Sequence, residues 1–103
     1  MKVRVSSHLG VRIDKCHELS RLKIVADLPI SQAPRLSKAL RGFGELDHEG
    51  FAWLDVGWIR AKSGLPDAGW NAKFEEMLQY ANVHGWLRRE PAMIRSHVEW
   101  SDP

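Results

Sequence analysis

The five tryptophans of this 103-residue chain all lie in its second half. So much aromatic area indicates either that the centre of the core lies there or that an aromatic surface there binds something. Trp70, Trp86 and Trp100 fit the helix and strand patterns described below, so we expect them in the core. Trp53 and Trp58 fit these patterns less well, which makes them the first candidates for a ligand-binding surface or a subunit interface.

The composition is that of a small globular protein. With 44% hydrophobic and 27% charged residues, the chain is expected to form a single domain over residues 1–103. It has one cysteine, Cys16, and no secretory segment after Met1, a combination that predicts a reducing, cytoplasmic compartment. Charged residues interrupt the apolar ones too often for a membrane span, so no membrane partner is expected.

Alternation of apolar and polar residues predicts four strands, over residues 2–6, 21–27, 51–56 and 94–100. One face of the last strand is apolar and consists of Ile94, Ser96, Val98 and Trp100. Its other face is polar and consists of Arg95, His97 and Glu99. The last strand is therefore expected to be half-buried, with its polar face toward solvent.

Helical spacing predicts two main helices and a short one between them. The first covers residues 32–42, with Ser31 as its N-cap and glycines at its end. A short amphipathic segment covers 58–63. The second main helix begins after Asp67 and ends at Gly85, which we expect to adopt a left-handed conformation with Trp86 packed back on the last turn.

These elements predict an α+β fold with two layers, in which about four mostly antiparallel strands are backed by two main helices. A second assembly of the same elements is a winged helix in the C-terminal half. There, the helices over 58–64 and 70–84 would form a helix-turn-helix, and residues 85–100 a wing hairpin. Arg88 and Arg89 would then lie at the wing tip and contact nucleic acid.

The polar face of the last strand is the sharpest candidate for catalysis. Because residues two apart on a strand point the same way, Glu99 could orient His97 as a general base, while Arg95 binds an anion. The alternative is a solvated strand face with cross-strand charge pairs. The spacing alone leaves open whether the chain is an enzyme.

Basic residues could make the outer face of the sheet a nucleic-acid surface. Lys2, Arg4, Lys23 and Arg95 can share that face, and Phe51 and Trp53 could add rings for base stacking. A net charge of only +2 makes nucleic acid the less favoured partner.

No cofactor or metal ion is expected. The five histidines and Cys16 show no paired metal-ligand spacing, and the glycines form no nucleotide-binding fingerprint.

The function favoured by the sequence is a non-enzymatic binding or accessory module that acts through an aromatic sheet surface. Aromatic rings with arginine at the rim are typical of protein interfaces, so Trp53, Trp58 and Arg95 are candidate binding residues. We expect a homodimer, or else another protein partner, and the surface could also accommodate a small molecule.

If Trp86 is buried beside the helix end, Trp86→Ala should lower the free energy of unfolding by about 3–5 kcal/mol.

Overall fold

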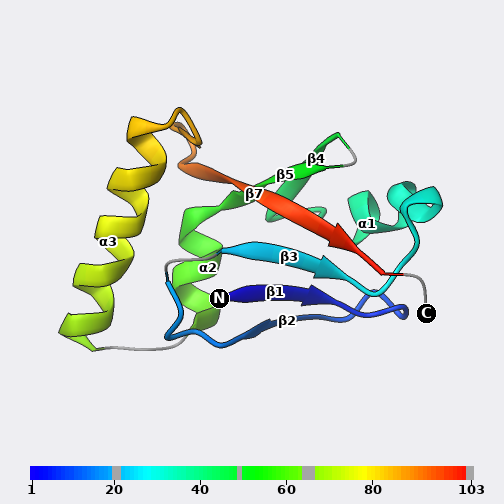
Figure 1. Ribbon diagram of the computed structural model, residues 1–103, viewed down its shortest axis with the longest axis horizontal. Coiled ribbons are helices and arrows are strands. Elements are labelled where there is room, and N and C mark those ends of the chain that lie inside the picture. Colours follow the sequence, from blue (N-terminus) through cyan, green and yellow to red (C-terminus); the bar gives the residue numbers. More distant parts are fainter. Residues whose placement is uncertain (20–21, 49, 64–66, 102–103) are drawn as a thin grey trace.

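The computed structural model describes residues 1–19, 22–48, 50–63 and 67–101 (Figure 1). The strands of this described part are β1 (Lys2–Val5), β2 (Val11–Asp14), β3 (Lys23–Ala26), β4 (Gly44–His48), β5 (Phe51–Asp55), β6 (Leu87–Arg88) and β7 (Met93–Trp100). Its α-helices are α1 (Ala33–Ala39), α2 (Val56–Ser63) and α3 (Ala68–Val83), and a 3₁₀ turn, Ile30–Gln32, precedes α1.

The α+β class is confirmed, but the prediction of about four mostly antiparallel strands is wrong. Within the described residues there are three α-helices and one mixed seven-stranded sheet in the order β2-β1-β3-β7-β5-β4, with β6 paired to β7. β1, β3 and β7 run parallel to one another, while β2, β4, β5 and β6 pair antiparallel with their neighbours.

The strands that the sequence missed carry little local signal. β2 lies at one edge of the sheet and has only half-buried or exposed residues. β4 lies at the other edge, and its polar residues resemble a turn because much of the strand faces solvent. The predicted strand over 21–27 begins at Lys23 in the structure, and Arg21 lies outside the described residues.

β7 lies inside the sheet, which excludes the winged-helix arrangement. α2, α3 and a β6–β7 hairpin do follow one another along the chain. However, β7 pairs with β5 along one edge and with β3 on the other, so it is a central strand and not the arm of a projecting wing.

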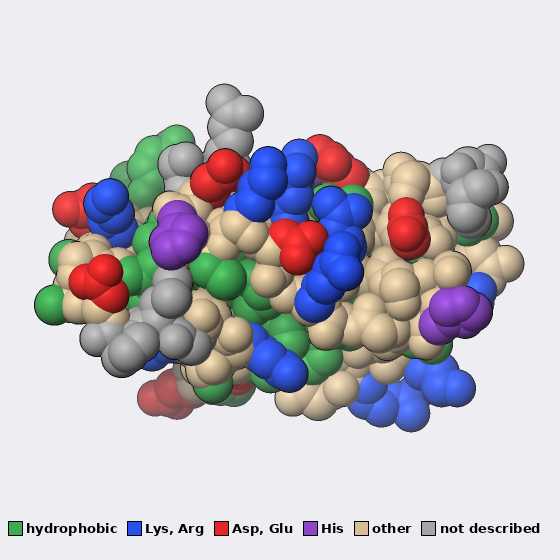
Figure 2. Space-filling view, turned by 90° about the horizontal axis from the view of Figure 1, so that it is seen from below, with side chains coloured by type: hydrophobic (Ala, Val, Ile, Leu, Met, Phe, Trp, Pro, Cys, Tyr) green, Lys and Arg blue, Asp and Glu red, His purple; other side chains and the backbone are tan. Residues whose placement is uncertain are grey.

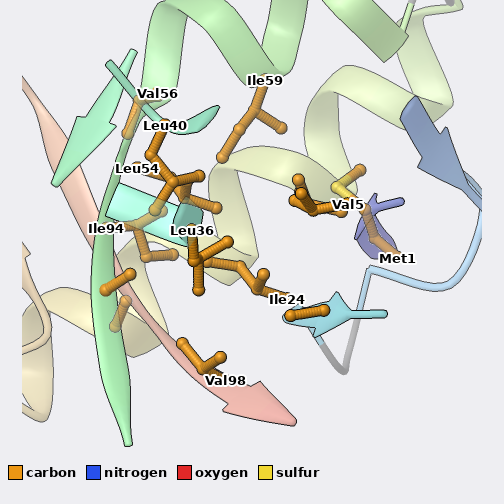
Figure 3. Close-up of a cluster of buried hydrophobic side chains, with 14 of the residues drawn as sticks. Met1, Val5, Ile24, Leu36, Leu40, Leu54, Val56, Ile59, Ile94 and Val98 are labelled. Atoms are coloured by element: carbon orange, nitrogen blue, oxygen red, sulfur yellow. The ribbon is translucent and has the colours of Figure 1, made fainter. Parts of the chain in front are cut away.

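The core lies between one face of the sheet and the helices. In Figure 1, α1 and α2 lie behind the strands and α3 flanks the end at which β3 begins. Figure 3 shows side chains of α1 (Leu36), its C-cap residue (Leu40) and α2 (Ile59) pointing toward Leu54 and Ile94 of the sheet. All five are at most 4% exposed. The apolar side of β7 faces this core, as predicted, and none of the described helices covers the opposite face of the sheet, which is toward the viewer in Figure 1.

Capping side chains fix where the helices begin. The Asp55 carboxylate accepts from the Trp58 N–H at 2.8 Å, so α2 begins directly after β5. The predicted cap Asp67 accepts from the Gly69 N–H at 2.8 Å and is confirmed. The predicted cap Ser31 is wrong, because α1 begins from a 3₁₀ turn and its N-cap residue makes no side-chain cap bond.

The predicted termination of α3 is confirmed, but the predicted burial of Trp86 is wrong. Gly85 is left-handed with φ of 76°, and the Trp86 N–H donates to the Ala81 carbonyl at 2.8 Å. The Trp86 ring stacks on His84 of the last turn, yet 39% of the residue stays exposed because nothing in the described chain covers its outer side. Trp70 is buried as predicted, and Trp100 is partly buried.

Because Trp86 is only partly buried, Trp86→Ala should lower the free energy of unfolding by about 1–2 kcal/mol. Trp70→Ala is the matched control. It removes a ring that is 6% exposed and stacked on Phe74, so it should cost about 3–5 kcal/mol. Equal losses in urea denaturation would contradict this assignment.

Gly85→Ala should lower the free energy of unfolding by about 1 kcal/mol through backbone strain alone. A Cβ at this position would meet no atom within 4 Å, so no clash contributes. Gly85→Asn should cost less than Gly85→Ala, because asparagine tolerates the left-handed region better. Urea denaturation measures the three stabilities. If they do not decrease in the order Gly85, Gly85→Asn, Gly85→Ala, the left-handed cap is wrong.

Candidate functional site

Two aromatic side chains lie on the face of the sheet that the helices leave open. Phe51 of β5 is directly opposite His97 of β7, and Trp53 is directly opposite Arg95. Since directly opposite residues of paired strands point to the same side, both rings share a face with the polar residues of β7. Both residues are half-buried.

An arginine guanidinium lies over each ring. The Arg95 Cζ is 4.0 Å from the centroid of Phe51, and the Arg88 Cζ is 4.6 Å from that of Trp53. Both guanidinium groups also form ion pairs with acidic residues of β4. Arg95 Nη2 is 3.3 Å from an Asp47 oxygen, and Arg88 pairs with Glu45. The cation–π contacts are therefore fixed in place by ion pairs.

Most of the other bases on this face are paired with acids in the same way. Arg4 and Arg12 lie 2.9 Å and 3.2 Å from oxygens of Asp14, and Lys23 Nζ is 2.9 Å from Glu99. Figure 2 views the molecule from the β1–β2 side. Its upper half shows Lys and Arg side chains interleaved with Asp and Glu side chains. The predicted cationic sheet is thus largely neutralised by its own acids.

A second aromatic cluster lies at the C-terminal end of α3. Tyr80, Val83 and Trp86 are 60%, 80% and 39% exposed, and they are three of the four large hydrophobic residues exposed in the described chain. The Tyr80 ring centroid is 4.3 Å from that of His84 and 5.9 Å from that of Trp86. The rings therefore support one another and are not isolated exposed side chains.

A hollow of about 220 Å³ lies between the open sheet face and the end of α3. Its described lining consists of Leu22, Phe51, Met77, Tyr80, Ala81, Trp86, Ile94, Arg95 and His97. The hollow forms where two strands share one edge of β7, since β6 pairs with Met93 and Ile94 and β3 pairs only from His97 onward. Leu22 and Trp86, which precede these two strands, lie on its walls.

We call Phe51, Trp53, Tyr80, Val83 and Trp86 the aromatic surface. The hollow connects its two parts, because Phe51, Tyr80 and Trp86 all line it. From the sequence, only Phe51 and Trp53 of this set are proposed as binding residues. The α3 residues were missed, although Tyr80 and Val83 are apolar positions outside the helix stripe that the core uses.

The structure does not join His97 and Glu99. Glu99 accepts a hydrogen bond from Lys23, and His97 is exposed, with its ring 5.7 Å from that of Phe51 in an edge-to-face contact. Arg95 forms an ion pair with Asp47 of β4, which lies beyond β5 in the sheet. The three residues share a face as predicted. Among the described residues, however, the Glu99 carboxylate is hydrogen-bonded to Lys23 and not to His97, so the two do not form an acid–base pair.

The other candidate binding residues of the sequence do not share one site. Trp58 lies on α2, on the helix side, where it stacks on Phe43 with ring centroids 3.9 Å apart. It is therefore not a neighbour of Trp53 on the open face. Arg88 is engaged with Trp53 and Glu45, whereas Arg89 is exposed in the β6–β7 turn.

Among the described residues, no three His, Cys, Asp or Glu side chains come close enough together to hold a metal ion. In that same part of the chain, no helix has the length and apolar character needed to cross a membrane. In comparisons with known proteins, the chain matches no protein-family model, no curated protein and no solved structure.

The ion pairs of the open face predict how stability depends on pH. The hydrogen bond from Lys23 lowers the pKa of Glu99 below its ordinary 4.5, and the hydrogen bond from Arg4 lowers that of Asp14 below 3.8. A carboxyl whose pKa is depressed by folding stabilises the native state above its unfolded pKa, and this contribution is lost as pH falls through the folded pKa.

The free energy of unfolding should therefore fall on acidification below pH 4.5. In the double variant Asp14→Asn, Glu99→Gln, it should fall less steeply. Urea denaturation of both proteins across this range measures the difference. If the free energies of unfolding of both proteins fall in parallel with pH, these ion pairs do not cause the loss of stability in acid.

Proposed function

We propose that this chain is a non-enzymatic binding module that associates with a second copy of itself through the aromatic surface. One observation carries the proposal, namely that three of the four exposed large hydrophobic residues in the described chain lie together, beside two more rings on the open sheet face. Solvent-exposed apolar side chains cost stability in water, and when they cluster they commonly mark an interface.

The composition of the surface supports a protein partner. Tryptophan, tyrosine and arginine are the residues that contribute most to binding energy at interfaces, and Trp53, Trp86, Tyr80, Arg88 and Arg95 all lie in or beside the aromatic surface. The molecule measures 38 × 24 × 21 Å, so its open face has room for the ~800 Å² that each partner buries in a standard interface.

The charge of the surface favours a second copy over nucleic acid. Arg88 is paired with Glu45 and Arg95 with Asp47, so positive and negative groups alternate and largely cancel. A surface of mixed sign can pair with itself across a two-fold axis, whereas a polyanion gains little from it. The ring faces are also covered by guanidinium groups, which leaves less of each ring for base stacking.

Analytical ultracentrifugation at protein concentrations from about 10 µM to 1 mM tests the proposal. The wild type should change from the 11.8 kDa monomer to a dimer within this range. Trp53→Ala and Val83→Ser should each weaken the dimer at least about tenfold, because each removes apolar contact area at the interface.

Ile30→Ser is the matched control. Ile30 is the fourth exposed large hydrophobic residue, 53% exposed, and it lies before α1, outside the aromatic surface. This variant should dimerise as the wild type does. A monomer at every concentration, or an equal effect of Ile30→Ser and Val83→Ser, would overturn the proposal.

A further inference from the structure

The hollow beside β7 has apolar walls and two basic side chains at its rim, of which Arg95 is also paired with the Asp47 carboxylate outside the lining. Phe51 and His97 lie on the sheet side, and Trp86 and Tyr80 lie on the α3 side. Leucine, isoleucine, methionine and alanine side chains complete the described lining, which contains no carboxylate. The only side chains in it that can carry a positive charge belong to Arg95 and His97, so the hollow suits a ligand with an apolar body and a negative end.

The Arg95 guanidinium is already oriented. Its Nη2 is 3.3 Å from the Asp47 carboxylate and 3.3 Å from His48 Nε2, and its Cζ lies over the Phe51 ring, 4.0 Å from the centroid. Both polar contacts use Nη2, so Nη1 has no partner among the described residues. A cation that is held in place loses little conformational entropy when an anion binds, which strengthens the contact.

The volume limits the size of the ligand. Sites for drug-sized molecules and cofactors occupy about 300–1,000 Å³, while an apolar cavity of about 150 Å³ can hold benzene. At about 220 Å³, the hollow fits one aromatic ring with a short side chain. It is too small for a nucleotide or a large cofactor.

We propose that the hollow binds a small aromatic carboxylate. The ring lies between Phe51 and Trp86, where offset or edge-to-face contacts with aromatic walls are favourable. The carboxylate accepts hydrogen bonds from Arg95 Nη1 and from a ring N–H of His97. One chain forms the whole described lining, so ligand binding needs no second copy, although Phe51, Tyr80 and Trp86 belong both to the hollow and to the aromatic surface.

Phenylacetate and its neutral analogue 2-phenylethanol are the probes, titrated into ¹⁵N-labelled full-length protein while the Trp86 indole resonance is followed by NMR. Phenylacetate should produce a saturable shift and bind at least about tenfold more tightly than the alcohol. Arg95→Gln should remove this preference for the acid. The exposed Arg89 lies outside the hollow, so Arg89→Gln is the matched control and should keep the preference.

His97→Trp provides a second, independent test, because a larger side chain at this exposed rim position should fill the hollow and prevent both probes from binding. Repeating the titration with Trp53→Ala separates this proposal from dimerisation, since that variant should bind phenylacetate even though its dimer is weakened. The proposal is wrong if phenylacetate gives no saturable shift, if acid and alcohol bind equally, or if Arg95→Gln and Arg89→Gln behave alike.

Discussion

The pairing of β7 with three other strands is the constraint on which the rest of the structure depends. β5 pairs with one edge of this eight-residue strand, while β6 and β3 share the other edge. One face of β7 places Ile94 and Val98 in the core, and the other presents Arg95 and His97 to the open side. Strand alternation thus assigns core and candidate site to opposite faces of a single strand.

The features of the candidate site follow from how these strands meet. A hollow opens between the start of β6 and the start of β3, which leave the middle of one edge of β7 without a strand partner, and α3 closes its far side. The antiparallel neighbours bring Arg88 over Trp53 and Arg95 over Phe51, while acids from β4 neutralise both arginines. The charges of the resulting aromatic surface largely cancel, and on this ground we propose a protein partner or a small ligand for it rather than nucleic acid.

Local signals in the sequence were sufficient wherever a residue acts on its near neighbours. The two faces of β7, the Asp67 cap and the left-handed Gly85 could all be predicted. Strand partners could not, because parallel pairing of β1, β3 and β7 joins segments far apart in the chain and leaves no local pattern. The left-handed cap at Gly85 correctly predicts that Trp86 contacts the last turn of α3. Such a cap carries no information about what covers the other side of the ring, so the predicted burial of Trp86 is wrong.

The candidate site was only partly predictable for the same reason. Shared strand faces brought Arg95 and His97 together with Phe51 and Trp53, as the sequence had allowed. The contacts that decide their chemistry are long-range, since Lys23 engages Glu99 and Asp47 engages Arg95. The exposed end of α3 became a candidate only when the fold placed it beside the open sheet face.

The tryptophan indole N–H resonances provide the most direct test of the central claim that the aromatic surface forms the contact between molecules. In ¹H–¹⁵N spectra recorded at increasing protein concentration, the Trp53 and Trp86 indole signals should shift together. Those of Trp58 and Trp70, which pack on the helix side, should stay in place. Five stationary signals, or shifts confined to Trp58 and Trp70, would contradict the account.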